Sequence, residues 1–147
     1  MINWHNWRDY NLKKVIYHLL PITPNITLQN HRNLGCLEVV KHLIDNGADP
    51  NLKNKEGETA LHGASLYGYL EVVKHLMANS ADQKLTNKKG ETALHKASYE
   101  GEHAIVKHLM VYGADHKLKD NNGKTAYDRA ADENYKELMD FLLPLTK

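Results

Sequence analysis

Two adjacent stretches of this chain repeat the same 33-residue pattern. Residues 54–86 and 87–119 are identical at 20 of 33 positions when they are aligned without a gap. Repetition at a fixed period of about 20–50 residues indicates a stack of small structural units, because one unit alone cannot bury its apolar side. A stack of this kind presents a long open surface, so the sequence predicts binding rather than catalysis.

Each copy predicts two helices followed by an extended loop. Thr59 precedes the first helix, where its hydroxyl can accept a hydrogen bond from a free N–H of the first turn, and Gly68 ends that helix. Residues 70–79 carry apolar side chains at helical spacing, which predicts a second helix with one buried face. The rest of the copy holds turn-forming residues around Gly57, and we call this loop the finger.

The end of the second helix differs in one copy. Gly47 and Gly113 stand at this corner in two copies, whereas Ser80 stands there in the copy between them. Glycine suits the left-handed backbone of a helix end, so we expect Ser80 to make its corner slightly less favourable.

The same register extends beyond the two regular copies in both directions. At the C-terminal end Asp128 takes the place of a histidine and Arg129 follows it, which predicts a polar capping unit that faces water. The predicted units are an irregular N-terminal cap helix (1–23) and a repeat domain (24–147), which comprises a degenerate repeat (24–53), two regular repeats (54–86 and 87–119) and a C-terminal capping repeat (120–147).

The motifs within one period resemble those of a known family. The run Thr-Ala-Leu-His-x-Ala-Ser at 59–65 and 92–98, the Glu-Val-Val-Lys-His-Leu helix and the Gly-Ala-Asp helix end are similar to ankyrin repeats. Alanine replaces the proline of the family pattern Thr-Pro-Leu-His, and the likeness covers residues 24–147. The resemblance implies an all-α solenoid of stacked helix-turn-helix units with protruding hairpin loops, whose usual activity is to hold another protein.

Composition narrows the range of partners and compartments. The chain has 19 Lys and Arg against 18 Asp and Glu, so its overall charge does not favour nucleic acid or membrane. The single cysteine, Cys36, fits a reducing compartment. No run approaches the roughly 20 apolar residues that span a bilayer, and the N-terminus lacks the apolar segment of a signal peptide. We expect an intracellular protein, cytoplasmic or nuclear, that is monomeric and does not contact membranes.

The ten histidines do not predict a metal site. The resemblance implies that His62 and His95 bond to the nearby threonine and to backbone, and so brace one unit against the next. His42, His75 and His108 recur every 33 residues on the second helix. Stacked helices lie about 8–10 Å apart, whereas zinc needs ligand atoms at about 2.0–2.1 Å, so these side chains are poorly spaced for a shared metal.

The same three histidines raise a question of pH dependence. His42, His75 and His108 stand where the family has an apolar residue. One hypothesis is that they are partly buried, so that protonation loosens the array toward about pH 6. The alternative is that they are exposed and titrate without any effect on stability.

Nothing in the sequence predicts an active site or a cofactor. Ser65 and Ser98 belong to a face of small packing residues, and Cys36 fills a variable position. Nucleophilic catalysis needs such a residue beside a base and an oxyanion site, and no phosphate-binding loop of the form Gly-x-x-x-x-Gly-Lys occurs. The chain is therefore predicted to be non-catalytic and to bind neither metal nor cofactor.

The predicted contact surface is the concave side, which comprises the finger tips and the exposed face of each first helix. The resemblance places partner contacts beside the finger glycine and near the end of the first helix. Tyr67 and Tyr99 are the natural anchors, since tyrosine gives a large contact area at low entropic cost. The predicted contact residues are Lys53, Lys55, Glu56, Glu58, Leu66, Tyr67, Thr86, Lys88, Lys89, Glu91, Tyr99, Glu100, Lys119, Asn121, Asn122 and Lys124.

Differences between the two regular copies support this surface. They cluster at positions where packing does not dictate the residue type, such as Gly63 against Lys96 and Tyr69 against Glu102. The fingers are also rich in lysine, which predicts either ordinary solvated hairpins or attraction of an acidic segment on a protein partner. Weak nucleic-acid binding through this ridge, and a role as the targeting or regulatory subunit of an enzyme complex, are the two alternatives.

Overall fold

The computed structural model describes residues 37–145, and every regular element in that range is helical. Residues 37–45 form a helix. The elements that follow are α3 (Ala60–Leu66), α4 (Leu70–Ala78), α5 (Ala93–Tyr99), α6 (His103–Val111), α7 (Ala126–Asp132), α8 (Lys136–Leu142) and the 3-10 helix η1 (Leu143–Leu145). The predicted all-α fold is confirmed. The predicted cap helix at 1–23, Cys36 and the first helix of the degenerate repeat lie outside the described residues.

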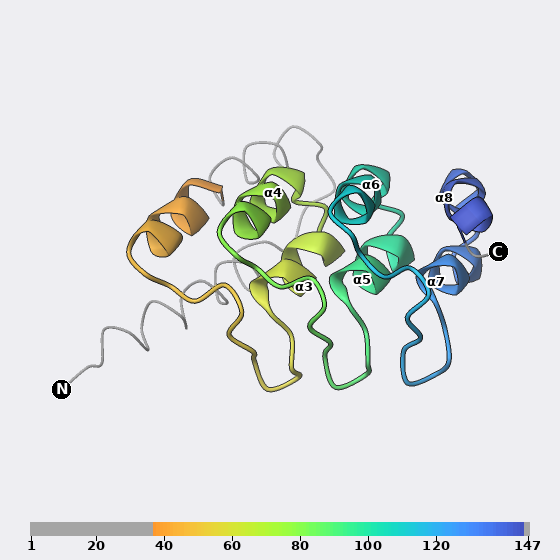
Figure 1. Ribbon diagram of the computed structural model, residues 1–147, viewed down its shortest axis with the longest axis horizontal. Helices are drawn as coiled ribbons and strands as arrows, with labels where there is room; N and C mark the ends of the chain where they lie inside the picture. The colour runs from red at the N-terminus through yellow and green to blue at the C-terminus, as the bar shows by residue number, and fades with distance from the viewer. Residues whose placement is uncertain (1–36, 146–147) are drawn as a thin grey trace.

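The helices are stacked in two layers (Figure 1). The first helices α3, α5 and α7 pack side by side in one layer, and the second helices α4 and α6 pack in the other, with α8 paired to α7. The fingers all project on the same side, next to the first helices. No helix in the described range is both long and apolar enough to cross a bilayer.

Each first helix begins at a threonine, as the sequence predicts. The hydroxyl of Thr92 accepts a hydrogen bond from the backbone N–H of His95 at 3.4 Å, while the N–H of Thr92 donates to Nδ1 of His95 at 3.1 Å. This reciprocal capping satisfies two backbone groups that a helix start leaves free. In the last repeat Asp128 takes the place of the histidine and accepts from the N–H of Thr125 at 2.9 Å.

The core runs through all the described repeats as one continuous cluster. Ala64 and Ala97 have no exposed surface, and these small side chains allow neighbouring first helices to approach closely. On the second helices Leu76 and Leu109 are fully buried between the layers. Burying such a leucine contributes about 1.5–3 kcal/mol relative to leaving it in water.

The corner after the second helix has a left-handed backbone in all three described copies. Gly47 and Gly113 each have φ of +88°, and Ser80 has φ of +71°. A serine in this region is strained because its Cβ crowds the neighbouring carbonyl oxygen. Ser80 therefore occupies a backbone conformation that favours glycine, and the small cost expected from the sequence stays a prediction.

Candidate functional site

The fingers are built around a polar side chain that folds each loop back on itself. The Oδ1 atom of Asn87 accepts hydrogen bonds from the N–H of Lys89 at 3.0 Å and from the N–H of Glu91 at 2.9 Å. Asn54 and Asp120 make the equivalent pairs of bonds in the neighbouring fingers. Each loop then turns through a glycine with positive φ, such as Gly90 at +73°, so the finger has a defined shape without being part of a sheet.

Adjacent finger tips are tied to one another by backbone hydrogen bonds. The N–H of Lys88 donates to the oxygen of Glu56 at 2.9 Å, and the N–H of Asn121 donates to the oxygen of Lys89 at 2.9 Å. These bonds join the three tips into one ridge, whose loops are seen along the lower edge in Figure 1. The exposed lysines of the fingers are Lys53, Lys55, Lys84, Lys88, Lys89, Lys117 and Lys119.

Beside the ridge, a chain of ion pairs crosses three repeats. The ammonium of Lys96 lies 2.9 Å from a carboxylate oxygen of Glu58 and 3.1 Å from one of Glu91. The guanidinium of Arg129 lies 3.2 Å from Glu91, and its Nε donates to Asp120 at 2.8 Å. We call these five residues the ion-pair ladder. Acid and base alternate along the stack, from Glu58 in the first described finger to Arg129 in α7.

The ladder favours the charged form of two of its carboxylates. Burial alone raises the pKa of Glu91, but the amide of Asn87 and the ammonium of Lys96 outweigh it and keep the pKa below its ordinary value of 4.5. Asp120 behaves in the same way, since the backbone N–H of Lys124 and the guanidinium of Arg129 overcome its burial. These carboxylates are therefore neutralised within the protein and do not offset the charge of the finger lysines.

Comparison with known families agrees with this architecture. A family model for three copies of the ankyrin repeat matches residues 28–120 and again residues 61–147. Together the two matches cover well over half of the chain. The protein belongs to the ankyrin-repeat family. Ankyrin repeats generally mediate protein–protein interaction, and domains built from them are typically non-catalytic.

The ankyrin array places most of the predicted contact residues on the ridge and at the ends of the first helices. Those with exposed side chains are Lys53, Lys55, Glu56, Lys88, Lys89, Tyr99, Glu100, Lys119, Asn121 and Asn122. Those that are half-buried are Glu58, Leu66, Tyr67, Thr86 and Lys124. Within this set the backbone oxygen of Thr86 accepts from the ammonium of Lys53 at 2.9 Å, and Lys124 pairs with Asp132.

One predicted contact residue is not available to a partner. Glu91 is buried between repeats, where its carboxylate is shared by Lys96 and Arg129 and also accepts from the amide of Asn87 at 2.8 Å. Glu58 is engaged with Lys96 in the same way, although it is half-buried. Both acids stabilise the contact between neighbouring repeats, and Glu91 is not part of the exposed concave face.

The two tyrosine anchors differ in their surroundings. Tyr99 ends α5 and has 41% of its surface exposed. Tyr67 follows α3, is half-buried against the core, and has its ring centroid 6.1 Å from that of Tyr69. Tyr99 is therefore the freer contact residue, whereas Tyr67 also contributes to packing.

Two expectations about surface positions are wrong. Gly63 and Lys96 were expected to differ because packing does not constrain them, but Gly63 is buried and Lys96 is the centre of the ion-pair ladder. Tyr69 is also buried, at 3% exposure, and a Cβ on Gly68 would lie 2.6 Å from the carboxylate of Glu102. Glu102, which follows the inter-helix glycine of its own copy, packs against Gly68 of the preceding copy, and a single copy does not reveal this contact.

Arg129 also departs from its expected role in the C-terminal cap. It was expected to face water as part of a polar end, but its guanidinium points back into the preceding repeat and binds Asp120 and Glu91. The substitution of Asp128 for histidine does fit an end position. An aspartate can cap its own helix, and no following repeat is present in the described residues to offer a carbonyl oxygen to a histidine.

Burial affects both histidines of the first helices. Nε2 of His62 lies 3.0 Å from the backbone oxygen of Glu91, and Nε2 of His95 lies 3.0 Å from that of Lys124. Both histidines brace one ankyrin repeat against the next, as the resemblance implied. Burial is the main reason that the pKa of each lies below 6.5.

The second-helix histidines are less uniform than the sequence suggested. His42 is exposed, whereas His75 and His108 are half-buried. Burial and the nearby charge of Lys74 lower the pKa of His108. The expectation of a partly buried imidazole is therefore met at His75 and His108 and not at His42, and its effect on stability stays a prediction.

Sequence reasoning missed a hollow at the last finger. A pocket of about 370 Å³ is lined by His116, Lys117, Lys119, Thr125, Tyr127 and Asp128. Its signal in the sequence is Tyr127, which stands where the regular repeats have the fully buried Leu61 and Leu94. This pocket continues the basic ridge toward the C-terminal repeat. Within residues 37–145 no three His, Cys, Asp or Glu side chains gather as metal ligands would.

Proposed function

We propose that this ankyrin array holds another protein across its concave face, as an adaptor, scaffold or inhibitor. The contact residues are Tyr99 and Tyr67, Leu66, Glu100 and the finger residues on either side of each tip. The partner presents an acidic segment to the ridge. A monomeric state and a location inside the cell remain predictions of the sequence.

The observation that carries this proposal is the separation of charge on the concave face. The acids next to the first helices are neutralised by Lys96 and Arg129. On the ridge, Lys55, Lys88 and Lys89 have no carboxylate partner within residues 37–145. Hydrogen bonds between the tips hold the backbone of these lysines in a row. A net basic ridge beside an exposed tyrosine suits a segment with carboxylates next to an apolar group, and charge of this kind speeds encounter.

Quantitative pull-down tests the proposal. The unaltered chain and two variants, Tyr99→Ala and Lys88→Glu with Lys89→Glu, serve as baits for lysate of the native cell, with mass spectrometry as readout. A true partner is recovered by the unaltered chain and reduced at least about tenfold with either variant, which corresponds to about 1.4 kcal/mol. Lys136→Glu on α8, an exposed lysine away from the concave face, is the matched control and leaves recovery unchanged.

The melting temperature must accompany these measurements. Tyr99 and both lysines are exposed, so their replacement leaves the melting temperature within about 2 °C, as for most surface substitutions. Tyr67→Ala is less suitable because Tyr67 packs against the core. If recovery survives the loss of Tyr99 and the ridge charges together, the concave face is not the contact surface.

Weak nucleic-acid binding is the second candidate, and the row of exposed lysines favours it. The logarithm of its affinity falls with the logarithm of salt concentration by roughly 0.7–0.9 for each phosphate neutralised. Titration of labelled single-stranded and double-stranded oligonucleotides at several salt concentrations distinguishes it from protein binding. A partner held by Tyr99 retains much of its affinity at high salt, whereas an oligonucleotide held only by lysines does not.

A further inference from the structure

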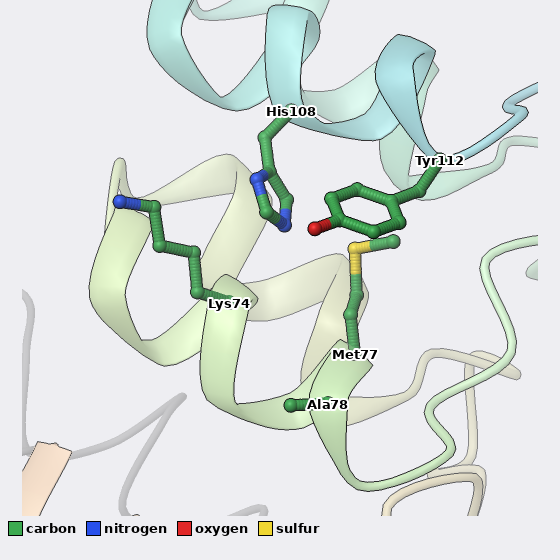
Figure 2. Close-up of a pocket in the computed structure, with 5 residues that line it drawn as sticks. All are labelled: Lys74, Met77, Ala78, His108 and Tyr112. Atoms are coloured by element: carbon green, nitrogen blue, oxygen red, sulfur yellow. The ribbon is translucent and has the colours of Figure 1, made fainter.

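A groove opens on the opposite, second-helix layer, away from the fingers. It has a volume of about 450 Å³ and is lined by Lys74, Met77 and Ala78 of α4 and by His108 and Tyr112 at the end of α6. Figure 2 shows the rings of His108 and Tyr112 directed from α6 toward Met77. The two ring centroids are 4.7 Å apart, so together they form one wall of the groove.

The sequence places apolar groups here where the other copies are polar. Asn46 and Asn79 stand at the position of Tyr112, and each amide donates to the backbone oxygen four residues earlier, at 2.7 and 2.8 Å. Such a bond gives a carbonyl group in the last helical turn a side-chain donor. Tyr112 gives up this side-chain bond and leaves 63% of its surface exposed.

The residue before Tyr112 follows the same trend. Val111 is 80% exposed, whereas Asp45 stands at its position in the first described repeat. Exposed apolar surface beside a groove commonly marks a contact site, because it gains free energy only when something covers it. Compared with the other copies, the repeat at 87–119 therefore lacks one side-chain bond at the end of its second helix. It exposes two apolar side chains there, of which Tyr112 lines the groove.

The equivalent positions one repeat earlier provide an internal comparison. There Asp45 and Asn79 occupy the positions of Ala78 and Tyr112, while Lys41, Ile44 and His75 match Lys74, Met77 and His108. The basic groups and one apolar side chain are thus common to both sets of positions, and Ala78 and Tyr112 are specific to the groove between α4 and α6. The groove combines an apolar floor with a cation and an imidazole at its edge.

We propose that this groove binds an acidic segment of a partner protein, with one large apolar side chain seated against Met77, Ala78 and Tyr112. A carboxylate of that segment pairs with Lys74 and accepts a hydrogen bond from His108. Lys74 at present pairs with Glu71 at 3.1 Å, but both side chains are about half exposed, and such a pair is easily exchanged. This surface is separate from the concave face and does not depend on the function proposed for it.

The charge of the chain argues that the occupant comes from another molecule. Residues 1–36 contain four Lys or Arg and a single Asp, so the N-terminal part of the chain does not supply an acidic segment. A second copy of the chain is a different occupant, and the experiment distinguishes it.

The test titrates the full chain, labelled with ¹⁵N, with a hexapeptide that has two glutamates on each side of a Leu-Phe pair. The expected chemical-shift changes centre on the resonances of Met77, Ala78, His108 and Tyr112. Tyr112→Asn and Ala78→Asp install the residues of the neighbouring groove, and each weakens binding at least tenfold. Binding also raises the pKa of His108, because a carboxylate then lies beside the ring, and titration of its ring resonances measures this.

The controls separate this groove from the basic ridge. The affinity is taken from the chemical-shift changes of the groove residues alone, and Lys136→Glu on α8, an exposed lysine away from both surfaces, leaves it unchanged. Peptides with Ala-Ala at the centre, or with lysine in place of glutamate, bind at least tenfold more weakly. Binding that persists in Tyr112→Asn, shift changes confined to the finger lysines, or equal affinity for the lysine peptide overturns the proposal. A dimer in sedimentation equilibrium that Tyr112→Asn abolishes also overturns it, since the occupant is then a second copy.

Discussion

The Nε2 atom of His62 lies 3.0 Å from the backbone oxygen of Glu91 in the next repeat. The other ring nitrogen, Nδ1, accepts from the N–H of Thr59 at 3.1 Å. A ring that accepts at Nδ1 must carry its proton on Nε2, so His62 is neutral and donates to Glu91. His95 repeats the arrangement with Thr92 and Lys124. Stability of the contact between repeats is therefore tied to two uncharged imidazoles.

Acidification should weaken the array through these two histidines and, in the same direction, through His108, whose pKa burial also lowers. The folded pKa values of His62 and His95 lie below the unfolded value of 6.5, so the unfolded chain binds protons first as the pH falls. Their contribution is complete above pH 6.5 and is lost below it, at up to about 1.4 kcal/mol per pH unit for each histidine. The charged groups that act on them are Glu58, Lys96, Lys53, Asp120 and Glu91.

Urea denaturation at pH 7.5 and at pH 5.5 measures this loss. The carboxylates of Glu91 and Asp120 have lowered pKa values, so their contribution is lost only below about pH 4.5 and 3.8 and does not enter this range. His42→Gln is the control, because His42 is exposed and lies outside the contacts that His62 and His95 make between repeats. Equal free energies of unfolding at the two pH values contradict the assignment.

Replacing Ser80 with glycine should stabilise the protein by about 0.5–1 kcal/mol, since glycine adopts positive φ without steric cost. The side chain of Ser80 is exposed, and the bond that Asn51 donates to the backbone oxygen of Ser80 is retained. Gly113→Ser is the mirror-image control and should destabilise by a similar amount. A lower urea midpoint for Ser80→Gly would show that its corner is not strained.

Removing the central cation of the ion-pair ladder should be costly. Lys96→Met leaves Glu58 and Glu91 facing each other without their shared ammonium, and we expect a loss of about 2–4 kcal/mol. Adding Glu58→Gln to Lys96→Met should recover part of that loss, because it removes one of the two carboxylates that then repel each other. A double-mutant cycle on the urea unfolding free energy checks both values. Additive losses would indicate that the two residues do not interact.

Tyr112→Asn should fold at least as well as the unaltered chain. The new amide can bond to the backbone oxygen of His108, as Asn79 bonds to that of His75 at 2.8 Å, and a bond of this kind contributes about 0.5–1.5 kcal/mol. The contact between the rings of Tyr112 and His108 is lost in exchange. Thermal melting checks the balance. A loss of more than about 2 kcal/mol would mean that Tyr112 serves packing instead of a partner.

Local patterns were sufficient to predict the helices and the capping of this protein. The threonine before each first helix, the glycines of the fingers and the apolar spacing of 70–79 each depend on residues close in sequence. The observed second helix, Leu70–Ala78, ends one residue short of that range. The 33-residue period then fixes which helices are neighbours, because each copy packs on the next.

Contacts between copies were beyond the same reasoning. Glu58 and Lys96 lie in different repeats. An alignment of the two regular copies shows only that one has glycine where the other has lysine. Arg129 was assigned to solvent because end repeats are usually polar, yet its length allows it to reach Asp120. Side chains with long reach and more than one possible partner are the part of the site that sequence alone did not place.

The ion-pair ladder has a consequence for the length of the array. The repeat at 87–119 pairs backward through Lys96 with Glu58 and forward through Glu91 with Arg129. A duplicated segment inserted after it would set its own lysine opposite Glu91 and offer its own glutamate to Arg129. Gene duplication could thus elongate this protein one module at a time, with each new junction already electrostatically matched.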